Sequence, residues 1–569
     1  MQTAKASGHY WKAMLSSLAI TVLGVLTPAP SSAAKFYKDD PILVEPESQD
    51  ASRVTPWKID LFYDLMLNQF ARPGIAPGSR AQNVNTIDEV PDSSWFTNRI
   101  MARPVSIEEA VRGPLTGDGP ARGPLTVIRA KAEGAAPGFT VRDTAGVTWF
   151  VAFDPPSNPE AASAAAVIAM RIFWTLGYNQ AEYYISELRR ESLQIDKNAT
   201  FQPPSGKIRP MTIHDIEPML ARAARKPSGA YRILASRLLP GKILGGFKYY
   251  GTRPDDPNDV VLHEQRRELR ALQVFGAWTN LVDIKALNTM DTLVTENGRS
   301  LVRHYLLDVG STFGIGANGP REWTEGYENL FEKDKTLKRL ATFGFYLQPW
   351  QTVDYEDNRS IGRFEGDRFD PLAWKSRVPA AALFQARDDD TFWAARRVMA
   401  FTDDMIRSLV KAGQYSDPEA EKLLAAVLIK RRDKIGQAYL TRVNPLVDFS
   451  LDSSRGLKFQ NAAKQAGMVK TPQAYSATWR LLDDRTGTST ALGETTSSNE
   501  EMAAPAGLPQ ATGSYVVAEV LVIDSQHASG AKPVHATFRR TDTGWKLVGI
   551  DRMPGQAATL PQPQTTASK

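Results

Sequence analysis

The sequence predicts an α+β protein in which strands and helices occupy separate stretches of the chain. Strand-like runs with alternating apolar residues lie between 125 and 153, and similar runs return between 476 and 550. Between them, apolar residues recur at helical spacing over 259–281 and again over 392–442. These patterns predict a mixed core followed by a small β-rich module.

The first expected elements lie in a Pro-rich stretch from Lys35 to Arg122. One helix is expected from Pro56 to Phe70, where apolar residues recur at helical spacing. The segment PDSSWFTNR contains Trp95 and Phe96, which we expect to insert into the main body. This stretch therefore forms an N-terminal extension of the core.

Three strands and one helix are expected next. The strands are 125–132, 138–143 and 147–153, and a turn at Asp143–Gly146 joins the last two. The helix runs from about Pro159 to Gly177, where the glycine ends it.

A long helix is expected from Asp259 to Leu281, capped by Asn258 or Asp259. Its charged cluster, from His263 to Arg270, is interpreted as a solvated face with Glu and Arg pairing at helical spacing. The alternative is that Arg266 or Arg267 reaches a bound phosphate or the loop that follows.

Candidate functional residues concentrate after this helix. In order, the chain presents Asp283, Lys285, Asn288, a strand run at 291–295, the turn Glu296-Asn297-Gly298, a second strand run at 300–307, and Asp308-Val309-Gly310. Asn-Gly readily adopts the positive φ of a two-residue hairpin turn. The hairpin is therefore expected to bring Asn288 and Asp308 to the same end.

This layout resembles the catalytic loop, the following hairpin and the metal-binding D-x-G of the protein-kinase-like superfamily, over about 123–314. The resemblance implies a two-lobed kinase-like core. It also implies that Asp283 orients an attacking hydroxyl, that Lys285 offsets the charge of the transferred phosphate, and that Asn288 and Asp308 hold Mg²⁺. ATP or another nucleotide would be the donor.

The sequence departs from this family at the phosphate-binding pair. Ala152 stands where the family has a Lys on the third strand, and the following helix has no inward-facing acid, since Glu160 is only at its start. The Lys and the Glu of this pair are expected to be lost together, because either charge buried without the other would cost free energy. Lys131, beside the glycine-containing turn, is the residue expected to reach the phosphates instead; the alternative is a surface lysine. Leu281-Val282 replaces the usual His-Arg.

Three functions follow from these patterns. The first is a divergent phosphotransferase that moves a phosphoryl group from a nucleotide to an envelope or extracellular acceptor, either protein or glycan. The second is a catalytically inactive pseudokinase that serves as a binding scaffold in the cell envelope. The third is a glycan-active hydrolase that uses the acids Asp255, Asp256 and Asp259, which otherwise are turn and cap residues.

The composition and the N-terminal pattern indicate where the protein is located and which kinds of site and partner it lacks. Lys5 and Lys12 precede an apolar run from Ala13 to Leu26 and a small-residue site ending at Ala34, which predicts a signal peptide and a periplasmic or secreted protein. The run is shorter than the ~20 residues of a membrane span. The chain has 0 Cys, which removes disulfides and thiolate metal sites. The net charge of +5 is not gathered into a stripe, so no nucleic-acid partner is expected.

A small β-sandwich-like module is expected at the C-terminus, with an envelope protein as its partner. Its strands are expected at 476–482, 514–523, 534–541 and 545–550, with a loose loop at 486–509. The expected division is a signal peptide (1–34), an N-terminal extension (35–122), a kinase-like small lobe (123–190), a mostly helical large lobe (191–450), a linker (451–474), the β-rich module (475–555) and a disordered tail (556–569).

Overall fold

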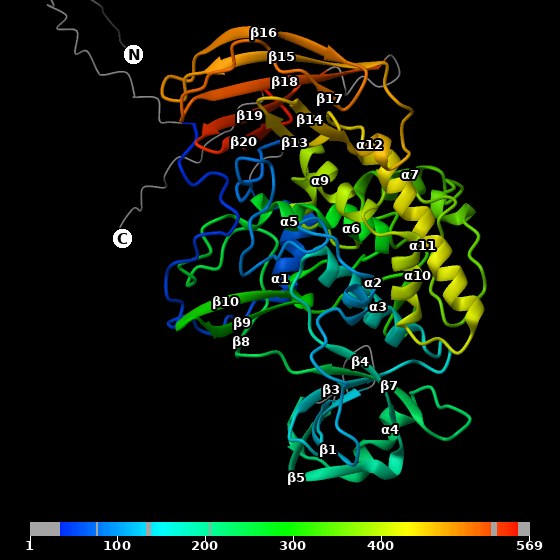
Figure 1. Cartoon of the computed structure of the whole chain (residues 1–569). Helices are drawn as coiled ribbons and strands as arrows, with labels where there is room; N and C mark the ends of the chain where they lie inside the picture. The colour runs from blue at the N-terminus through cyan, green and yellow to red at the C-terminus, as the bar shows by residue number, and fades with distance from the viewer. Residues whose placement is uncertain (1–34, 75–77, 132–137, 204–205, 525–531, 556–569) are drawn as a thin grey trace, which may run out of the picture.

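The computed structural model describes residues 35–74, 78–131, 138–203, 206–524 and 532–555. It has an α+β architecture with three bodies stacked along one direction (Figure 1). We call them the sheet body (123–237), the helical body (238–445) and the sandwich body (446–552). The expected signal peptide (1–34) and tail (556–569) lie outside the described residues. Within the described part of the chain, no helix combines the length and apolar composition needed to cross a bilayer.

The sheet body contains a seven-stranded sheet in the order β4-β7-β3-β2-β1-β5-β6. Its strands are β1 (Leu125–Lys131), β2 (Gly138–Arg142), β3 (Thr148–Phe153), β4 (Tyr183–Leu188), β5 (Leu193–Gln202), β6 (Arg209–Pro210) and β7 (Tyr231–Arg237). The first three are the expected strands. The expected lobe boundary at residue 190 is too early, because β7 inserts between β3 and β4 and the sheet therefore ends at Arg237.

The helix after β3 connects the sheet body to the helical body. α3 (Ala161–Leu176) is buried on nearly all sides, and its residues belong to the core of the helical body. Its many alanines favour the helix and let neighbours approach closely. Gly177 ends it at a φ of 131°, and a Cβ there would lie 2.2 Å from the Phe96 ring. Phe96 and Trp95 are both buried in the main body, as expected.

The stretch expected as one long helix from Asp259 to Leu281 is broken and buried. It forms a 3₁₀ turn (His263–Gln265), α5 (Arg267–Arg270) and α6 (Leu272–Thr279). Every charged side chain from His263 to Arg270 is at most 2% exposed, so the expectation of a solvated face is wrong. Local helical spacing cannot show that another part of the chain covers the charged side; here, residues of the N-terminal extension cover it.

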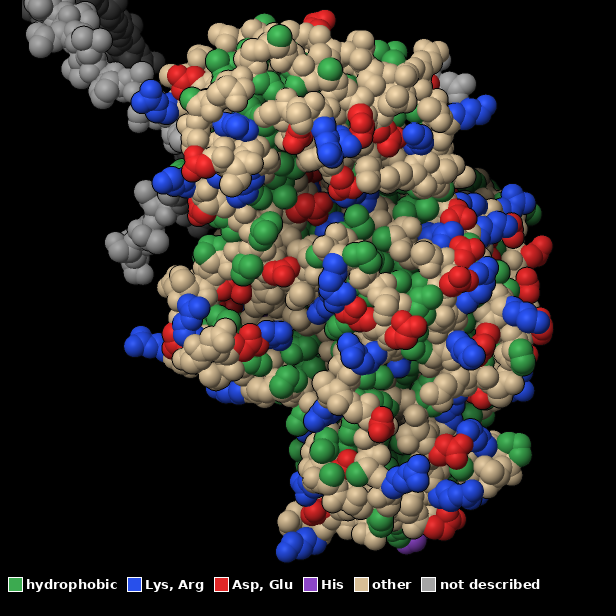
Figure 2. Space-filling model, viewed as in Figure 1, with side chains coloured by type: hydrophobic (Ala, Val, Ile, Leu, Met, Phe, Trp, Pro, Cys, Tyr) green, Lys and Arg blue, Asp and Glu red, His purple; other side chains and the backbone are tan. Residues whose placement is uncertain are grey.

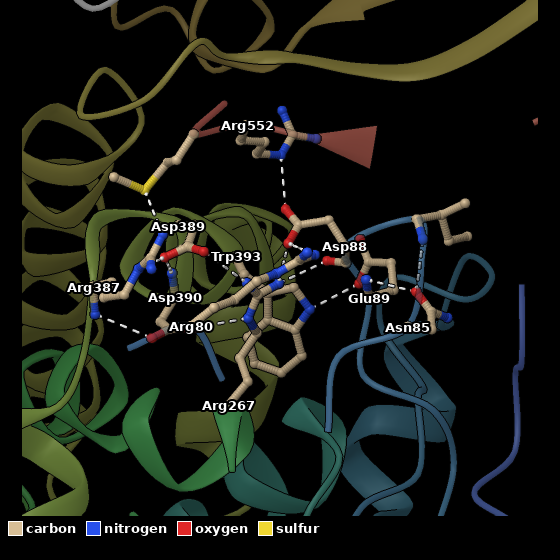
Figure 3. Close-up of polar contacts among 12 residues, drawn as sticks. Arg80, Asn85, Asp88, Glu89, Arg267, Arg387, Asp389, Asp390, Trp393 and Arg552 are labelled. Carbon is tan, nitrogen blue, oxygen red and sulfur yellow. Dashed lines mark hydrogen bonds and ion pairs between the residues drawn. The ribbon is translucent and has the colours of Figure 1, made fainter. Parts of the chain in front are cut away.

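Arg267 lies at the centre of a buried ion network that joins distant parts of the chain (Figure 3). Its guanidinium contacts Asp88 at 2.8 Å, Asp390 at 2.9 Å and Asp389 at 3.3 Å. Asp88 also accepts a hydrogen bond from Arg552 Nε at 3.0 Å. Arg267 therefore touches neither the candidate catalytic loop nor a phosphate position. It connects the extension, the helical body and the sandwich body.

Glu89, drawn with Trp393 beside this network in Figure 3, forms a second set of ion pairs. It lies 3.0 Å from both Arg396 and Arg397 and accepts a hydrogen bond from Trp393 Nε1 at 2.8 Å. Burial alone would raise the pKa of Glu89, but the two arginines outweigh burial and lower the pKa from 4.5 to about 2.

The pKa of Glu89 is lower in the folded protein than in the unfolded chain. Glu89 therefore contributes its full stabilisation above the pKa of the unfolded chain, and this stabilisation is lost as the pH falls towards the folded-state pKa. We expect the free energy of unfolding to decline between pH 4.5 and about pH 2. In Glu89→Gln this decline should be smaller, as measured by urea unfolding across that range. Replacing the exposed Glu419 with Gln is the matched control and should leave the decline unchanged; an equal effect of both variants would contradict the assignment.

The helical body surrounds α6 and α3. The N-terminal extension contributes α1 (Leu61–Met66), continued by a π turn (Leu67–Ala71), and α2 (Ile107–Arg112). The helical body itself contributes α7 (Lys333–Ala341), α8 (Ala381–Phe384), α9 (Asp388–Met399), α10 (Asp403–Lys411) and α11 (Pro418–Tyr439). The helical spacing expected over 392–442 is divided among α9, α10 and α11, and Thr402 caps α10 by accepting a hydrogen bond from Met405 N. Asp417 caps α11 in the same way through Glu419 N.

The sandwich body packs two sheets around one core. The first contains β13 (Leu446–Asp452), β14 (Gly456–Asn461) and β17 (Glu501–Met502); the second has the order β16 (Ser489–Ser497), β15 (Ala474–Leu482), β18 (Tyr515–Ile523), β19 (Val534–Thr541) and β20 (Gly544–Asp551). The expected linker at 451–474 instead contains most of the first sheet and α12 (Ala462–Gln465). The expected loop at 486–509 contains β16, an edge strand whose polar residues face solvent.

Charged side chains of both signs are interspersed over the face shown in Figure 2. This distribution gives that face no single-sign area of the kind that binds nucleic acid.

Candidate functional site

The hairpin after α6 brings Asn288 and Asp308 together. β9 (Thr289–Glu296) and β10 (Arg299–Leu306) pair from Glu296 opposite Arg299 back to Thr289 opposite Leu306. Asn297 and Gly298 form the turn with φ of 49° and 77°. Leu307 N and Asp308 N both donate to the Asn288 carbonyl, at 3.0 and 3.3 Å. The expected hairpin is therefore present, and it fixes the two candidate metal ligands at one end.

Asp283 lies next to this pair and is held by three neighbours. Lys285 Nζ is 2.8 Å from one carboxylate oxygen and 2.9 Å from the other. Asn288 Nδ2 donates to the Asp283 carbonyl at 2.8 Å. This bond turns the amide nitrogen of Asn288 towards the loop, so the amide oxygen is its free ligand atom. Arg321 Nη2 lies 3.5 Å from the Asp283 carboxylate.

The two carboxylates of the site have pKa values shifted in opposite directions. Burial raises the pKa of Asp283, but Lys285 and Arg321 outweigh burial and leave it below the ordinary value. Burial, together with the charge of Asp283, raises the pKa of Asp308. Asp283 is thus an ionised group suited to orient a hydroxyl, and Asp308 is a carboxylate that gains from a nearby cation.

Asp308 lies at the edge of a cleft of about 500 Å³. The cleft is lined mainly by apolar side chains from β3, β7, α3 and the hairpin: Phe150, Val151, Ala152, Ala166, Leu234, Leu239, Met290 and Leu307. Gly310 explains the close approach of α3, because a Cβ there would lie 3.3 Å from Ala166. An apolar cavity with a polar group at one end is typical of a site for a flat ring with a charged tail.

Lys131, the residue expected to reach the phosphates, is only partly described. Lys131 is the last residue of β1, but its side chain lies outside the described residues, as does the turn at 132–137. Its expected contact with phosphates therefore stays a prediction. Ala152 does line the cleft.

Asp154, two residues after Ala152, takes part in a polar connection that the sequence analysis missed. It is 1% exposed and accepts hydrogen bonds from Ser163 N at 2.7 Å and Ser163 Oγ at 2.6 Å. Arg232 on β7 donates to Ser163 Oγ at 2.8 Å. These contacts fasten β3, α3 and β7 to one another. An acid directly after a buried strand was the signal available in the sequence.

Arg321 is a second residue that sequence reasoning missed. Its guanidinium bridges Asp283 and the Glu325 carboxylate, with Nε 3.2 Å from Glu325 Oε2. Arg377 Nη1 contacts the other oxygen of Glu325 at 3.0 Å. Arg321 follows a short hairpin of β11 (Ile315–Gly316) and β12 (Gly319–Pro320), so no local pattern indicated its return to the site.

The donor set at Asn288 and Asp308 fits Mg²⁺ only with help from a ligand. Among the described residues, no cluster of three or more His, Cys, Asp or Glu could hold a metal ion by itself. Mg²⁺ commonly takes one or two carboxylates and completes its shell with waters and substrate phosphates. Asp308 and the Asn288 amide oxygen supply that limited set.

Comparison with known proteins finds similarity to solved structures but none at the level of sequence families. No family model and no curated protein matches the sequence. A crystal structure of the Golgi casein kinase with Mn and ADP bound aligns with a TM-score of 0.28 and 11% identity, covering 69% of this chain and 94% of that one. A second structure of the Golgi casein kinase aligns with a TM-score of 0.30 and 9% identity, covering 70% and 95%.

Proposed function

We propose that the protein is a divergent kinase-like phosphotransferase that moves a phosphoryl group from a nucleotide to an envelope or extracellular acceptor. The observation that carries this proposal is the convergence of Asp283, Lys285, Asn288 and Asp308 beside an apolar cleft between two bodies. Phosphoryl transfer needs positioning and charge stabilisation more than covalent chemistry, and these four groups supply both.

Each group has a role that its surroundings support. Asp283, ionised beside Lys285, accepts a hydrogen bond from the acceptor hydroxyl and takes its proton. Lys285 offsets charge on the transferred group. Asn288 and Asp308 would hold Mg²⁺, which would neutralise negative charge on the nucleotide phosphates.

The scaffold alternative is favoured by one observation. Ala152 lines the cleft where the family has a phosphate-binding Lys, and Asp154 is already engaged with Ser163. The hydrolase alternative loses support, because Asp255 binds Thr55 and Arg253, and Asp259 lies 2.7 Å from His263 Nε2. These acids stabilise loops and do not line a described cavity.

Location and partners belong to the same proposal. The expected signal peptide would deliver the chain to the periplasm or outside the cell, where the acceptor is a protein or a glycan. The sandwich body would dock on an envelope protein. ATP or another nucleotide would be the donor in that setting.

Nucleotide binding tests the proposal through thermal stability. We expect ATP with Mg²⁺ to stabilise the mature chain, by about 2.7 kcal/mol at 100 times the dissociation constant. Asp308→Asn should abolish the Mg²⁺-dependent part of this shift because a neutral amide is a poorer ligand. The exposed Asp404→Asn is the control and should respond as the wild type does. No shift with any nucleotide would favour the scaffold.

A further inference from the structure

The helical body contains a second cavity of about 440 Å³ that shares no lining residue with the cleft. Four aromatic side chains contribute to its wall: Tyr327, Tyr355, Phe369 and Trp374. Five basic and three acidic side chains complete the charged part of the lining. Its size and aromatic lining are those of small-molecule sites.

Arg431, on α11, stands out among these residues. Its side chain belongs to a run that the sequence presents as a charged face, yet it is only 5% exposed. Its Nε and Nη1 have no hydrogen-bond partner, and within the described chain no carboxylate forms an ion pair with it. By contrast, the adjacent Arg432 lies 2.8 Å from Asp403.

Aromatic rings cover the guanidinium of Arg431 without satisfying its donors. Its Cζ lies 3.8 Å from the centre of the Phe369 ring and 4.3 Å from that of Phe364. Such contacts satisfy the faces of a guanidinium, whereas its N–H groups point outward in the plane. Burial lowers the pKa of Arg431 to about 10, although Glu365 and two tyrosines partly oppose this.

Glu365, the acid whose charge acts on Arg431, already has other partners. Its carboxylate accepts hydrogen bonds from Tyr327 Oη at 3.3 Å and from Arg368 N at 2.7 Å. A buried cation without a partner is costly, and the cost falls when an anion with matching geometry binds. The excess of basic over acidic residues in the lining favours the same occupant.

We infer that this cavity binds a small organic anion, with Arg431 holding its carboxylate or phosphate group and the aromatic wall contacting a ring on the same molecule. Arginine presents parallel N–H donors that suit either oxyanion. Nothing in this inference depends on phosphoryl transfer, so its test uses no nucleotide.

The cavity also borders the candidate catalytic loop. Glu325 lines the cavity and contacts Arg321, which in turn lies beside Asp283. Glu325, in the cavity wall, is therefore two ion pairs from the proposed catalytic carboxylate, so the cavity and the catalytic loop share one charged connection.

Titration calorimetry on the mature chain tests the inference with four probes: phenyl phosphate, benzoate, inorganic phosphate and benzyl alcohol. We expect saturable binding of at least one ring-bearing anion and none of the neutral alcohol. Arg431→Met should weaken that binding at least about tenfold, since a charge-assisted contact is lost. The preferred probe distinguishes a phosphate ligand from a carboxylate one.

Two variants besides Arg431→Met, Ala373→Trp and Arg407→Met, separate loss of binding from loss of folding. Arg431→Met should fold, because it removes an unpaired buried charge and keeps an apolar stem. Ala373→Trp, at an exposed position of the wall, should block the same binding, and Arg407→Met on the exposed surface should preserve it. Absence of saturable binding up to about 10 mM of every probe, unchanged binding in Arg431→Met, or equal binding of the neutral alcohol would each overturn the inference.

Discussion

Replacing Asp283 with Asn is expected to slow the transfer of the γ-phosphoryl group from a labelled nucleotide by about 10²–10⁴-fold. Nucleotide binding should persist in this variant. The amide cannot take the proton of an attacking hydroxyl. It also loses the two charged contacts, with Lys285 at 2.8 Å and Arg321 at 3.5 Å, that hold the carboxylate. The measurement is the single-turnover rate at saturating Mg²⁺, with water or an added hydroxyl acceptor.

The control separates this effect from a general loss of charge. Asp404 is 82% exposed and pairs with Arg407 on the same helix, so Asp404→Asn should leave the rate unchanged. The Asp283→Asn protein should still show a Mg²⁺-dependent thermal shift, since Asn288 and Asp308 remain. A wild-type rate in Asp283→Asn would remove Asp283 from the proposed mechanism, and a wild type that binds nucleotide but never releases phosphate would favour the scaffold.

Replacing Arg267 with Met is expected to lower the free energy of unfolding by about 3–5 kcal/mol. The variant leaves the carboxylates of Asp88, Asp389 and Asp390 close together without the guanidinium that contacts all three. The remaining arginines compensate only partly, because each forms an ion pair with one member of the group: Arg80 and Arg552 with Asp88, Arg270 with Asp390, and Arg387 with Asp389. Urea unfolding at neutral pH measures the loss.

The matched variant for this network is Arg407→Met, which removes an exposed arginine paired with two exposed acids. It should change the free energy of unfolding by no more than about 1 kcal/mol. Adding Asp88→Asn to Arg267→Met should recover part of the loss, because it removes one of the three carboxylates that lost their contact with Arg267. Equal losses in Arg267→Met and Arg407→Met would show that the network contributes no more than a surface pair.

Local patterns predicted the elements near the site well. Alternation identified β1, β2 and β3, and Asn297-Gly298 identified the hairpin turn whose pairing brings Asn288 to Asp308. These features depend on backbone preferences and on the two-residue period of a strand, which are properties of a few consecutive residues.

Predictions from local patterns were wrong where contacts between distant segments determine burial and strand pairing. The charged run from His263 to Arg270 follows helical spacing, but the N-terminal extension covers it, so its charges are buried and the helix is broken. β7 joins the first sheet from beyond the expected boundary, and β16 pairs with β15 through polar residues that resemble a loop.

The sequence by itself determined the first three strands along the chain and the hairpin of β9 and β10. It also determined the types of residue at the site, namely Asp283, Lys285, Asn288 and Asp308. Only the tertiary structure decided which charges are buried, that Asp154 holds α3 through Ser163, that Arg321 returns to Asp283, and that Arg431 lines a cavity without a partner. The physical reason is that burial and ion pairing depend on segments hundreds of residues apart, whereas hairpins and helix ends depend on neighbours along the chain.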